Sequence, residues 1–219
     1  MLIFETIVNC EGLHADISLN VLGTGFHRNL VYQIDFDNFV EGCYAAVHLQ
    51  LPSALYVDVN ELSNIRRLGI STACSSGETD VELFCEKAKA QNVTVCSPLS
   101  HANCTLKFPI HQRYQYANEN GEYVNITLPK STLLLGCKEK IKEHRISKLD
   151  LCSPCVELVA KWREIPYSMD MEDIWTVPVG DTTMLPLVTY VTLLITVLCT
   201  IFLARTICKS VPIQHPKRE

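Results

Sequence analysis

Several features that mark catalytic or nucleic-acid-binding proteins are missing from this sequence. The 19 Lys and Arg residues form no long basic run, and a net charge of −5 offers nucleic acid no electrostatic footprint. The 9 Gly residues form no phosphate-binding loop, and no Ser or Cys nucleophile signature is present. The residue chemistry alone therefore predicts no catalytic residue, no metal site, no cofactor and no nucleic-acid partner.

An export signal is also missing from the start of the chain. Residues 1–12 lack a basic beginning, and Glu5 interrupts their apolar stretch. A tail-anchored protein would lack such a signal too, but its cysteines and glycosylation sequons would then lie in the cytosol. We therefore expect the natural chain to begin upstream of Met1.

One long apolar run stands near the C-terminus. Residues 182–204 carry no formal charge, and as a helix of about 1.5 Å per residue they would reach roughly 34 Å, enough to cross a bilayer core of about 30 Å. Acidic residues precede the run and basic residues follow it from Arg205 onward, and positive charge marks the cytoplasmic side. The pattern predicts a luminal domain over 1–181, a transmembrane helix over 182–204 and a short basic cytosolic tail over 205–219.

Cysteines and sequons agree with that topology. Nine of the 11 cysteines precede the apolar run, as in proteins that mature in an oxidising compartment. Glycosylation sequons begin at Asn92, Asn103 and Asn125. We expect all three to be glycan acceptors, Asn103 with the least support because Cys104 could join a disulfide. Nine is an odd number, so one luminal cysteine should remain over, for which Cys10 is the candidate.

Cys152 and Cys155 form the single Cys-X-X-Cys motif. A thiol oxidoreductase would place such a pair at a helix start within a βαβ pattern, which the surrounding sequence lacks. We interpret both as structural disulfide cysteines. A zinc site built from Cys96, His101 and Cys104 is a weaker alternative, because no second close pair accompanies them in a segment that should be oxidised.

Alternation of apolar and polar residues dominates the rest of the chain and is typical of strands. Asn92 and Thr94, for example, alternate with Val93 and Val95, so that the sequon falls on a polar face. The expected strands are 30–36, 43–51, 80–86, 92–96, 103–108 and 123–128. Helical spacing appears at 59–68, and 118–121 suggests a hairpin turn between the last two strands. The prediction is a mainly β fold: an antiparallel, sandwich-like luminal domain followed by one transmembrane helix.

A few charged side chains could carry chemistry. His27 with Arg28, and His111 with Arg113, could act in acid–base catalysis, but isolated His-Arg pairs on strands are more often structural or part of an interface. Asp58, Asn60 and Glu61 are metal ligands by type, yet they equally suit a helix cap and an acidic first turn. We therefore favour the structural interpretation for both groups.

Four segments of the chain read GFHRNL at 25–30, LPSALYVDVNEL at 51–62, FPIHQRY at 108–114 and VPVG at 177–180. Together they resemble the PIG-X family of non-catalytic subunits of glycosylphosphatidylinositol (GPI) mannosyltransferase I. Their order and approximate spacing match that family over about 25–204.

The resemblance implies a type I membrane protein of the endoplasmic reticulum. Its family role is to bind and stabilise PIG-M, the multi-pass catalytic subunit that adds the first mannose to the GPI precursor from dolichol-phosphate mannose. The chain departs from the family pattern at Ala54, where Gly is expected, and at Val59, where Pro is expected. Both changes concern a turn rather than a role.

The resemblance also suggests where a partner would bind. The expected luminal contacts are His27, Arg28, Tyr56, Asp58, Glu61, His111, Arg113 and Tyr114. In the membrane, Thr189, Thr192, Thr196 and Thr200 would form one polar stripe for packing against another helix. The alternative for the stripe is that each Thr bonds its own helix backbone.

Two other functions stay open from the residues alone. A cell-surface adhesion or receptor-type module would also sit on a single-pass anchor. A thiol oxidoreductase centred on the Cys-X-X-Cys motif is a weaker third reading.

Overall fold

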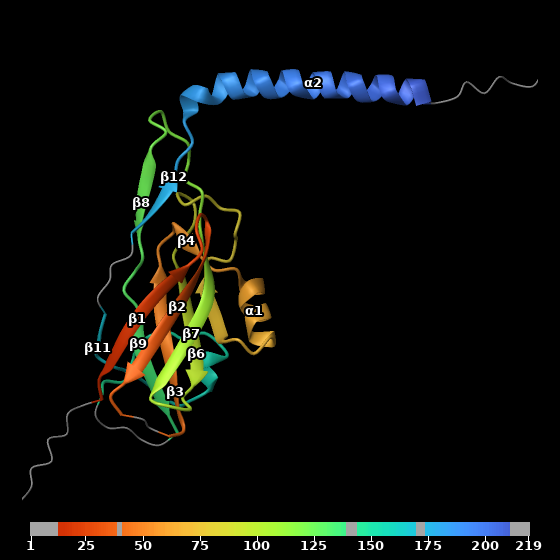
Figure 1. Ribbon diagram of the computed structural model, residues 1–219. Coiled ribbons are helices and arrows are strands. Elements are labelled where there is room, and N and C mark those ends of the chain that lie inside the picture. The colour runs from red at the N-terminus through yellow and green to blue at the C-terminus, as the bar shows by residue number, and fades with distance from the viewer. Residues whose placement is uncertain (1–12, 39–40, 139–143, 170–173, 211–219) are drawn as a thin grey trace, which may run out of the picture. The chain divides into compact units, whose positions relative to one another are not determined.

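The structure is a computed structural model that describes residues 13–38, 41–138, 144–169 and 174–210 (Figure 1). The chain divides into two compact units. The first comprises the chain up to Tyr116 together with Tyr123–Pro178, and the second comprises Ala117–Glu122 together with the chain from Val179 onward.

The first unit contains two five-stranded sheets and one two-stranded ladder. One sheet has the order β11 (Tyr167–Ser168), β1 (Ala15–Leu22), β2 (His27–Phe36), β7 (Asn103–Gln112) and β4 (Leu55–Tyr56). The other has the order β10 (Trp162–Glu164), β9 (Thr132–Cys137), β3 (Cys43–Leu51), β6 (Gln91–Pro98) and β5 (Thr72–Gly77). The ladder pairs β8 (Tyr123–Thr127) with β12 (Ile174–Pro178). β1 and β11 run parallel, whereas the other neighbours are antiparallel.

One apolar core joins the two larger sheets. Leu30, Tyr32 and Ile34 of β2 and Val93 and Val95 of β6 are fully buried in the same cluster. Alternate side chains of a strand point to opposite faces, so each sheet turns one apolar face inward. The predicted mainly β, sandwich-like domain is therefore confirmed.

Helix α1 (Val59–Arg67) follows the short strand β4. The Asp58 side chain caps its first turn by accepting a hydrogen bond from the Asn60 amide at 2.8 Å. Leu62 faces the core and is 2 % exposed, and the helix packs against β5 and β7. The helix expected over 59–68 and its acidic cap are both confirmed.

Disulfides fasten a loop onto the outer face of the second sheet. Cys74 of β5 bonds Cys152, and Cys96 of β6 bonds Cys155. The two Cys-X-X-Cys residues are thus structural disulfide cysteines, as predicted, and each pairs with a strand rather than with its neighbour. The zinc alternative that included Cys96 is wrong, because a disulfide sulfur is not a thiolate ligand.

The covered outer face corrects the expectation for the first sequon. Thr94 is 1 % exposed and its hydroxyl lies 3.0 Å from Nδ1 of His48, which is also buried. The alternation over 92–96 was sound, but a second apolar cluster that includes Trp162 covers the side expected to be polar. Burial of the imidazole lowers the pKa of His48 and so favours the neutral ring.

A third disulfide joins Cys43 of β3 to Cys137 of β9 at facing positions. Cys85 and Cys104 form no disulfide with any described cysteine. Burial, reinforced by the Asp35 carboxylate, raises the pKa of the Cys104 thiol to about 12, so this thiol stays protonated and unreactive. Cys10, the expected odd cysteine, lies outside the described residues.

The strand expected over 80–86 is wrong, because this segment forms turns. Several backbone groups in and beside this segment bond side chains instead of a neighbouring strand. Glu78 accepts from the amides of Thr79 and Asp80, while the Arg113 guanidinium donates to the carbonyl oxygens of Asp80 and Leu83. Local side-chain partners of this kind compete with strand pairing even where the apolar alternation is correct.

The segment 118–121 turns as expected but makes no hairpin. Asn118 accepts from the amides of Asn120 and Gly121 through its side chain, and Gly121 has a φ of +57°. A Cβ on Gly121 would lie 2.6 Å from Cβ of Asp181, so only glycine fits there. The following strand β8 does not pair with β7. It pairs instead with β12, the last strand of the first unit in the sequence.

The second unit continues into a 3-10 turn, η2 (Thr182–Met184), and the helix α2 (Leu185–Ser210). Among the described helices, α2 is long and apolar enough to cross a membrane. It extends beyond the predicted end at residue 204 and takes in Arg205 and Lys209. Long basic side chains at a helix end can reach back to the lipid headgroups, so Arg205 and Lys209 are compatible with the end of a membrane helix.

The disulfide pairing yields a direct test. Non-reducing peptide mapping should link Cys96 to Cys155, and a peptide with Cys152 joined to Cys155 would contradict the fold. Replacing Cys96 and Cys155 by Ser should lower the free energy of unfolding by about 2–5 kcal/mol, because the bond closes a long loop. Cys85→Ser is the matched control and should cost far less, because Cys85 bonds no described cysteine and a Ser hydroxyl can replace its thiol beside Ser53.

Candidate functional site

Strand register places two distant histidines directly opposite each other. In the pairing of β2 with β7, His27 lies directly opposite His111, although 84 residues separate them. The ring centroids are 4.6 Å apart in an edge-to-face arrangement. On the other side of β7, Tyr56 of β4 pairs with His111 and stacks on its ring at 4.9 Å.

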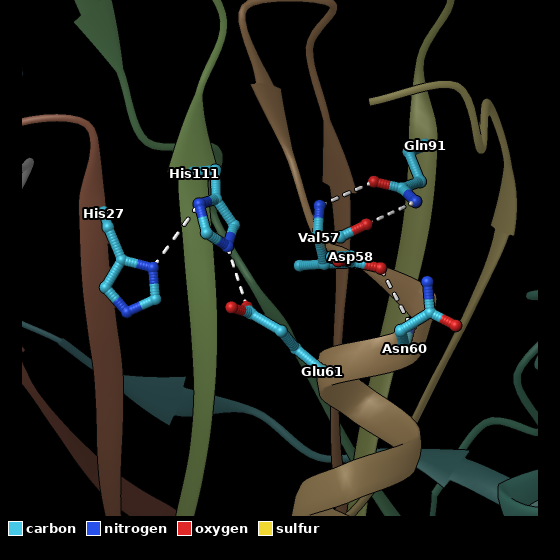
Figure 2. Close-up of polar contacts among 7 residues, drawn as sticks. All are labelled: His27, Val57, Asp58, Asn60, Glu61, Gln91 and His111. Atoms are coloured by element: carbon cyan, nitrogen blue, oxygen red, sulfur yellow. Dashed lines mark hydrogen bonds and ion pairs between the residues drawn. The ribbon is translucent and has the colours of Figure 1, made fainter. Parts of the chain in front are cut away.

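Polar contacts extend this group to helix α1. Nδ1 of His27 lies 3.4 Å from Nδ1 of His111, and Nε2 of His111 lies 2.8 Å from a carboxylate oxygen of Glu61 (Figure 2). Glu61 stands in the first turn of α1, where its charge also suits the helix dipole. We call His27, Tyr56, Glu61 and His111 the histidine cluster.

The turn that carries Glu61 is held by a residue that the sequence did not single out. Gln91 of β6 is 1 % exposed and bonds Val57 at both ends of its amide group: it accepts from the Val57 amide at 2.8 Å and donates to the Val57 carbonyl at 3.1 Å (Figure 2). This clamp precedes Asp58, the cap of α1, so it fixes where the helix begins. A lone Gln at the start of a strand gives no sequence signal of such a role.

Arg113 supports the cluster from behind. Its side chain is 2 % exposed, and its guanidinium carbon lies 4.5 Å from the ring centre of Tyr56. One terminal nitrogen donates to the carbonyl oxygens of Asp80 at 2.7 Å and Leu83 at 3.0 Å. Burial raises the pKa of the Tyr56 hydroxyl, and the positive charge of Arg113 opposes that rise. Arg113 thus joins the cluster to the 80–83 turn rather than facing solvent.

The remaining expected contacts lie beside the cluster. Arg28 follows His27 on β2, donates to the Gly25 carbonyl at 3.1 Å and places its guanidinium 4.5 Å from the ring centre of Trp175. Tyr114 follows Arg113, packs on Phe26 with ring centroids 4.6 Å apart and is 65 % exposed. The luminal residues expected to bind a partner therefore gather at one end of the first sheet and its helix.

Sequence reasoning passed over Phe26 and Trp175. Phe26 lies next to His27 in the GFHRNL segment, so the sequence could have indicated that it belongs to the site. Trp175 precedes the VPVG segment by two residues and is buried in β12, and no local pattern links it to Arg28. The contact between Arg28 and Trp175 depends on β12, a strand that lies much later in the sequence than Arg28.

The threonines of the α2 stripe bond the backbone of their own helix, which is the alternative given in the sequence analysis. Each hydroxyl donates to the carbonyl oxygen four residues earlier at 2.7–2.8 Å, which satisfies Thr189, Thr192, Thr196 and Thr200 within the helix. The hydroxyl oxygens keep the capacity to accept a hydrogen bond. A neighbouring helix could therefore use the stripe as an acceptor surface and as a place for close packing.

The three sequons differ in exposure. Asn103 and Asn125 are exposed, whereas Asn92 is half-buried beside the buried Thr94. Cys104 forms no disulfide with a described cysteine, so exposure is the property that separates the three sequons in the structure. On exposure, Asn92 is the least favourable of the three acceptors.

Comparison with known proteins adds a family and named relatives. The family model described as PIG-X / PBN1 matches residues 23–208. A human protein named "GPI alpha-1,4-mannosyltransferase I, stabilizing subunit" is 30 % identical over 191 residues, which cover 82 % of this chain and 74 % of that protein. Proteins of the same name from Rattus norvegicus and Mus musculus are 26 % and 25 % identical over 200 residues, with 86 % of this chain and 79 % of theirs covered.

The position of Arg113 leads to a stability prediction. Arg113→Ala should lower the free energy of unfolding by about 2–4 kcal/mol, because it removes two hydrogen bonds from a charged donor and the stacking on Tyr56. Arg67→Ala is the control: Arg67 is exposed on α1, so its removal should change stability by no more than about 0.5 kcal/mol. Denaturant unfolding of the detergent-purified chain measures both, and equal effects would contradict the supporting role of Arg113.

Proposed function

The chain belongs to the PIG-X / PBN1 family, and on that premise we propose that it binds and stabilises PIG-M, the catalytic subunit of GPI mannosyltransferase I, in the endoplasmic reticulum membrane. The relatives carry the words "stabilizing subunit" in their names, and the chain is accordingly a non-catalytic subunit. Its part in adding the first mannose is then to keep the enzyme folded and assembled.

The observation that best supports a binding role is the convergence of family-like residues. His27, Tyr56, Glu61, His111 and Tyr114 come from three separate segments and meet at one end of one sheet. Core packing does not require an exposed Tyr114 or a half-exposed Glu61 there. Aromatic side chains that keep an exposed face are the residues that most often anchor protein interfaces.

Binding can stabilise a partner without any chemistry. A protein that associates with the folded form of PIG-M and not with its unfolded form shifts the folding equilibrium by mass action. We propose that the histidine cluster with Tyr114 supplies the luminal contact, and that α2 supplies a membrane contact. In lipid, helices associate through close packing and hydrogen bonds, for which the threonine stripe offers small side chains and acceptor oxygens.

The proposed compartment rests on the cysteine chemistry. Three disulfides form and persist in an oxidising environment, which fits a luminal first unit. We propose that Asn103 and Asn125 carry glycans, with Asn92 modified less completely. A resident of the endoplasmic reticulum keeps high-mannose, endoglycosidase H-sensitive glycans, whereas a cell-surface adhesion module on the same anchor would acquire resistant ones.

A complementation experiment tests the proposal. Cells that lack this chain should contain less PIG-M and display fewer GPI-anchored proteins, and the wild-type chain should restore both. Tyr114→Ala should restore them poorly, because loss of an anchoring aromatic side chain costs about 2 kcal/mol or more, a roughly 30-fold weaker association. Tyr123→Ala is the matched control, since Tyr123 is 71 % exposed and lies outside the cluster.

A second variant in the same experiment tests the membrane contact. Replacing Thr189, Thr192, Thr196 and Thr200 together by Leu should leave the luminal domain folded and weaken co-purification with PIG-M. Normal PIG-M abundance and normal GPI anchoring in cells without the chain would contradict the stabilising role altogether.

A further inference from the structure

The two facing histidines have the geometry of a metal-binding pair. Their Nδ1 atoms are 3.4 Å apart, longer than the usual hydrogen bond between nitrogens. Two ligands of a tetrahedral Zn²⁺ ion, each at about 2.0–2.1 Å from the metal, are separated by about 3.3 Å. The observed separation therefore matches the edge of a zinc coordination tetrahedron.

The contact with Glu61 sets the tautomer of His111. An ionised carboxylate only accepts hydrogen bonds, so the 2.8 Å contact requires the proton of the neutral ring to be on Nε2. Nδ1 of His111 is then an unprotonated nitrogen with its lone pair directed at His27. Metal-binding histidines are typically oriented in this way, with a carboxylate accepting from the ring nitrogen that does not bind the metal.

The surroundings make this pair rigid and accessible. The register of β2 with β7 fixes the backbones of both histidines, and Tyr56 stacks on the ring of His111. His27 is exposed, while His111 and Glu61 are half-buried, so an ion can reach the pair from solvent. One ligand atom from each of the three residues lies within 4.8 Å of the others, which places a carboxylate close to any cation bound there.

We propose that His27 and His111 bind a divalent transition-metal ion of the Zn²⁺ class through their Nδ1 atoms. Glu61 orients His111 and adds negative charge beside the site. The positions that remain in the coordination shell face solvent, where water completes them. This inference is independent of the proposed function, because it concerns the isolated chain and not its partner.

Zinc titration of the detergent-purified full chain, against a chromophoric chelator as competitor, tests the site. The wild-type chain should bind a single Zn²⁺ ion, and His27→Asn or His111→Asn should abolish that binding. Glu61→Gln should weaken it about tenfold, the loss typical of removing a supporting carboxylate. His101→Asn, which alters an exposed histidine before β7, is the control and should bind zinc as the wild type does.

Circular dichroism of each variant separates loss of a ligand from loss of the fold. His27 is exposed, so its replacement should leave the spectrum unchanged. A wild-type chain that binds no Zn²⁺ would overturn the inference. Zinc binding that persists in the folded double variant, His27→Asn with His111→Asn, would overturn it equally, because the ion would then lie on other ligands such as the thiol of Cys85.

Discussion

The antiparallel pairing of β2 with β7 is the constraint on which the rest of the structure depends. Leu30, Tyr32 and Ile34 face Phe108, Leu106 and Cys104 across this ladder. A shift by one residue would turn these core side chains to the solvent, so burial of the apolar face fixes the register. The same register places His27 opposite His111, and the geometry of the histidine cluster is therefore a consequence of core packing.

A second constraint acts on the other sheet. Two disulfides fasten the loop that carries Cys152 and Cys155 to β5 and β6, and that loop covers the outer face of the sheet. In the loop-closure model, bonds that span 78 and 59 residues each stabilise the fold by about 4 kcal/mol. Because both faces of the second sheet are largely covered, it is the first sheet and α1 that present the family-like residues of the histidine cluster.

The sequence predicted what depends on local patterns. Alternation located β2, β3, β6, β7 and β8, and the acidic cap located α1, because period and capping are encoded within a few residues. It could not predict which cysteines pair, because that depends on long-range packing. It also failed at 80–86, where Arg113, some 30 residues away, occupies carbonyl groups that a strand would need.

The residues of the candidate site could be predicted from local motifs, but their arrangement depends on long-range strand pairing. Its residues were named from a resemblance in three segments, but their convergence required the register of β2, β4 and β7. Gln91 and Trp175 were missed, since each acts through a contact between distant strands. The burial of Arg113 assigns it a supporting role that no sequence pattern distinguishes from an exposed contact.

Site-specific photo-crosslinking in intact membranes tests most directly whether this end of the first sheet contacts the catalytic subunit. A photoreactive phenylalanine analogue in place of His27 should form a covalent adduct with PIG-M. The same analogue in place of Gln50, which is exposed on β3 of the other sheet, should not. An adduct from position 50 with none from position 27 would contradict the account.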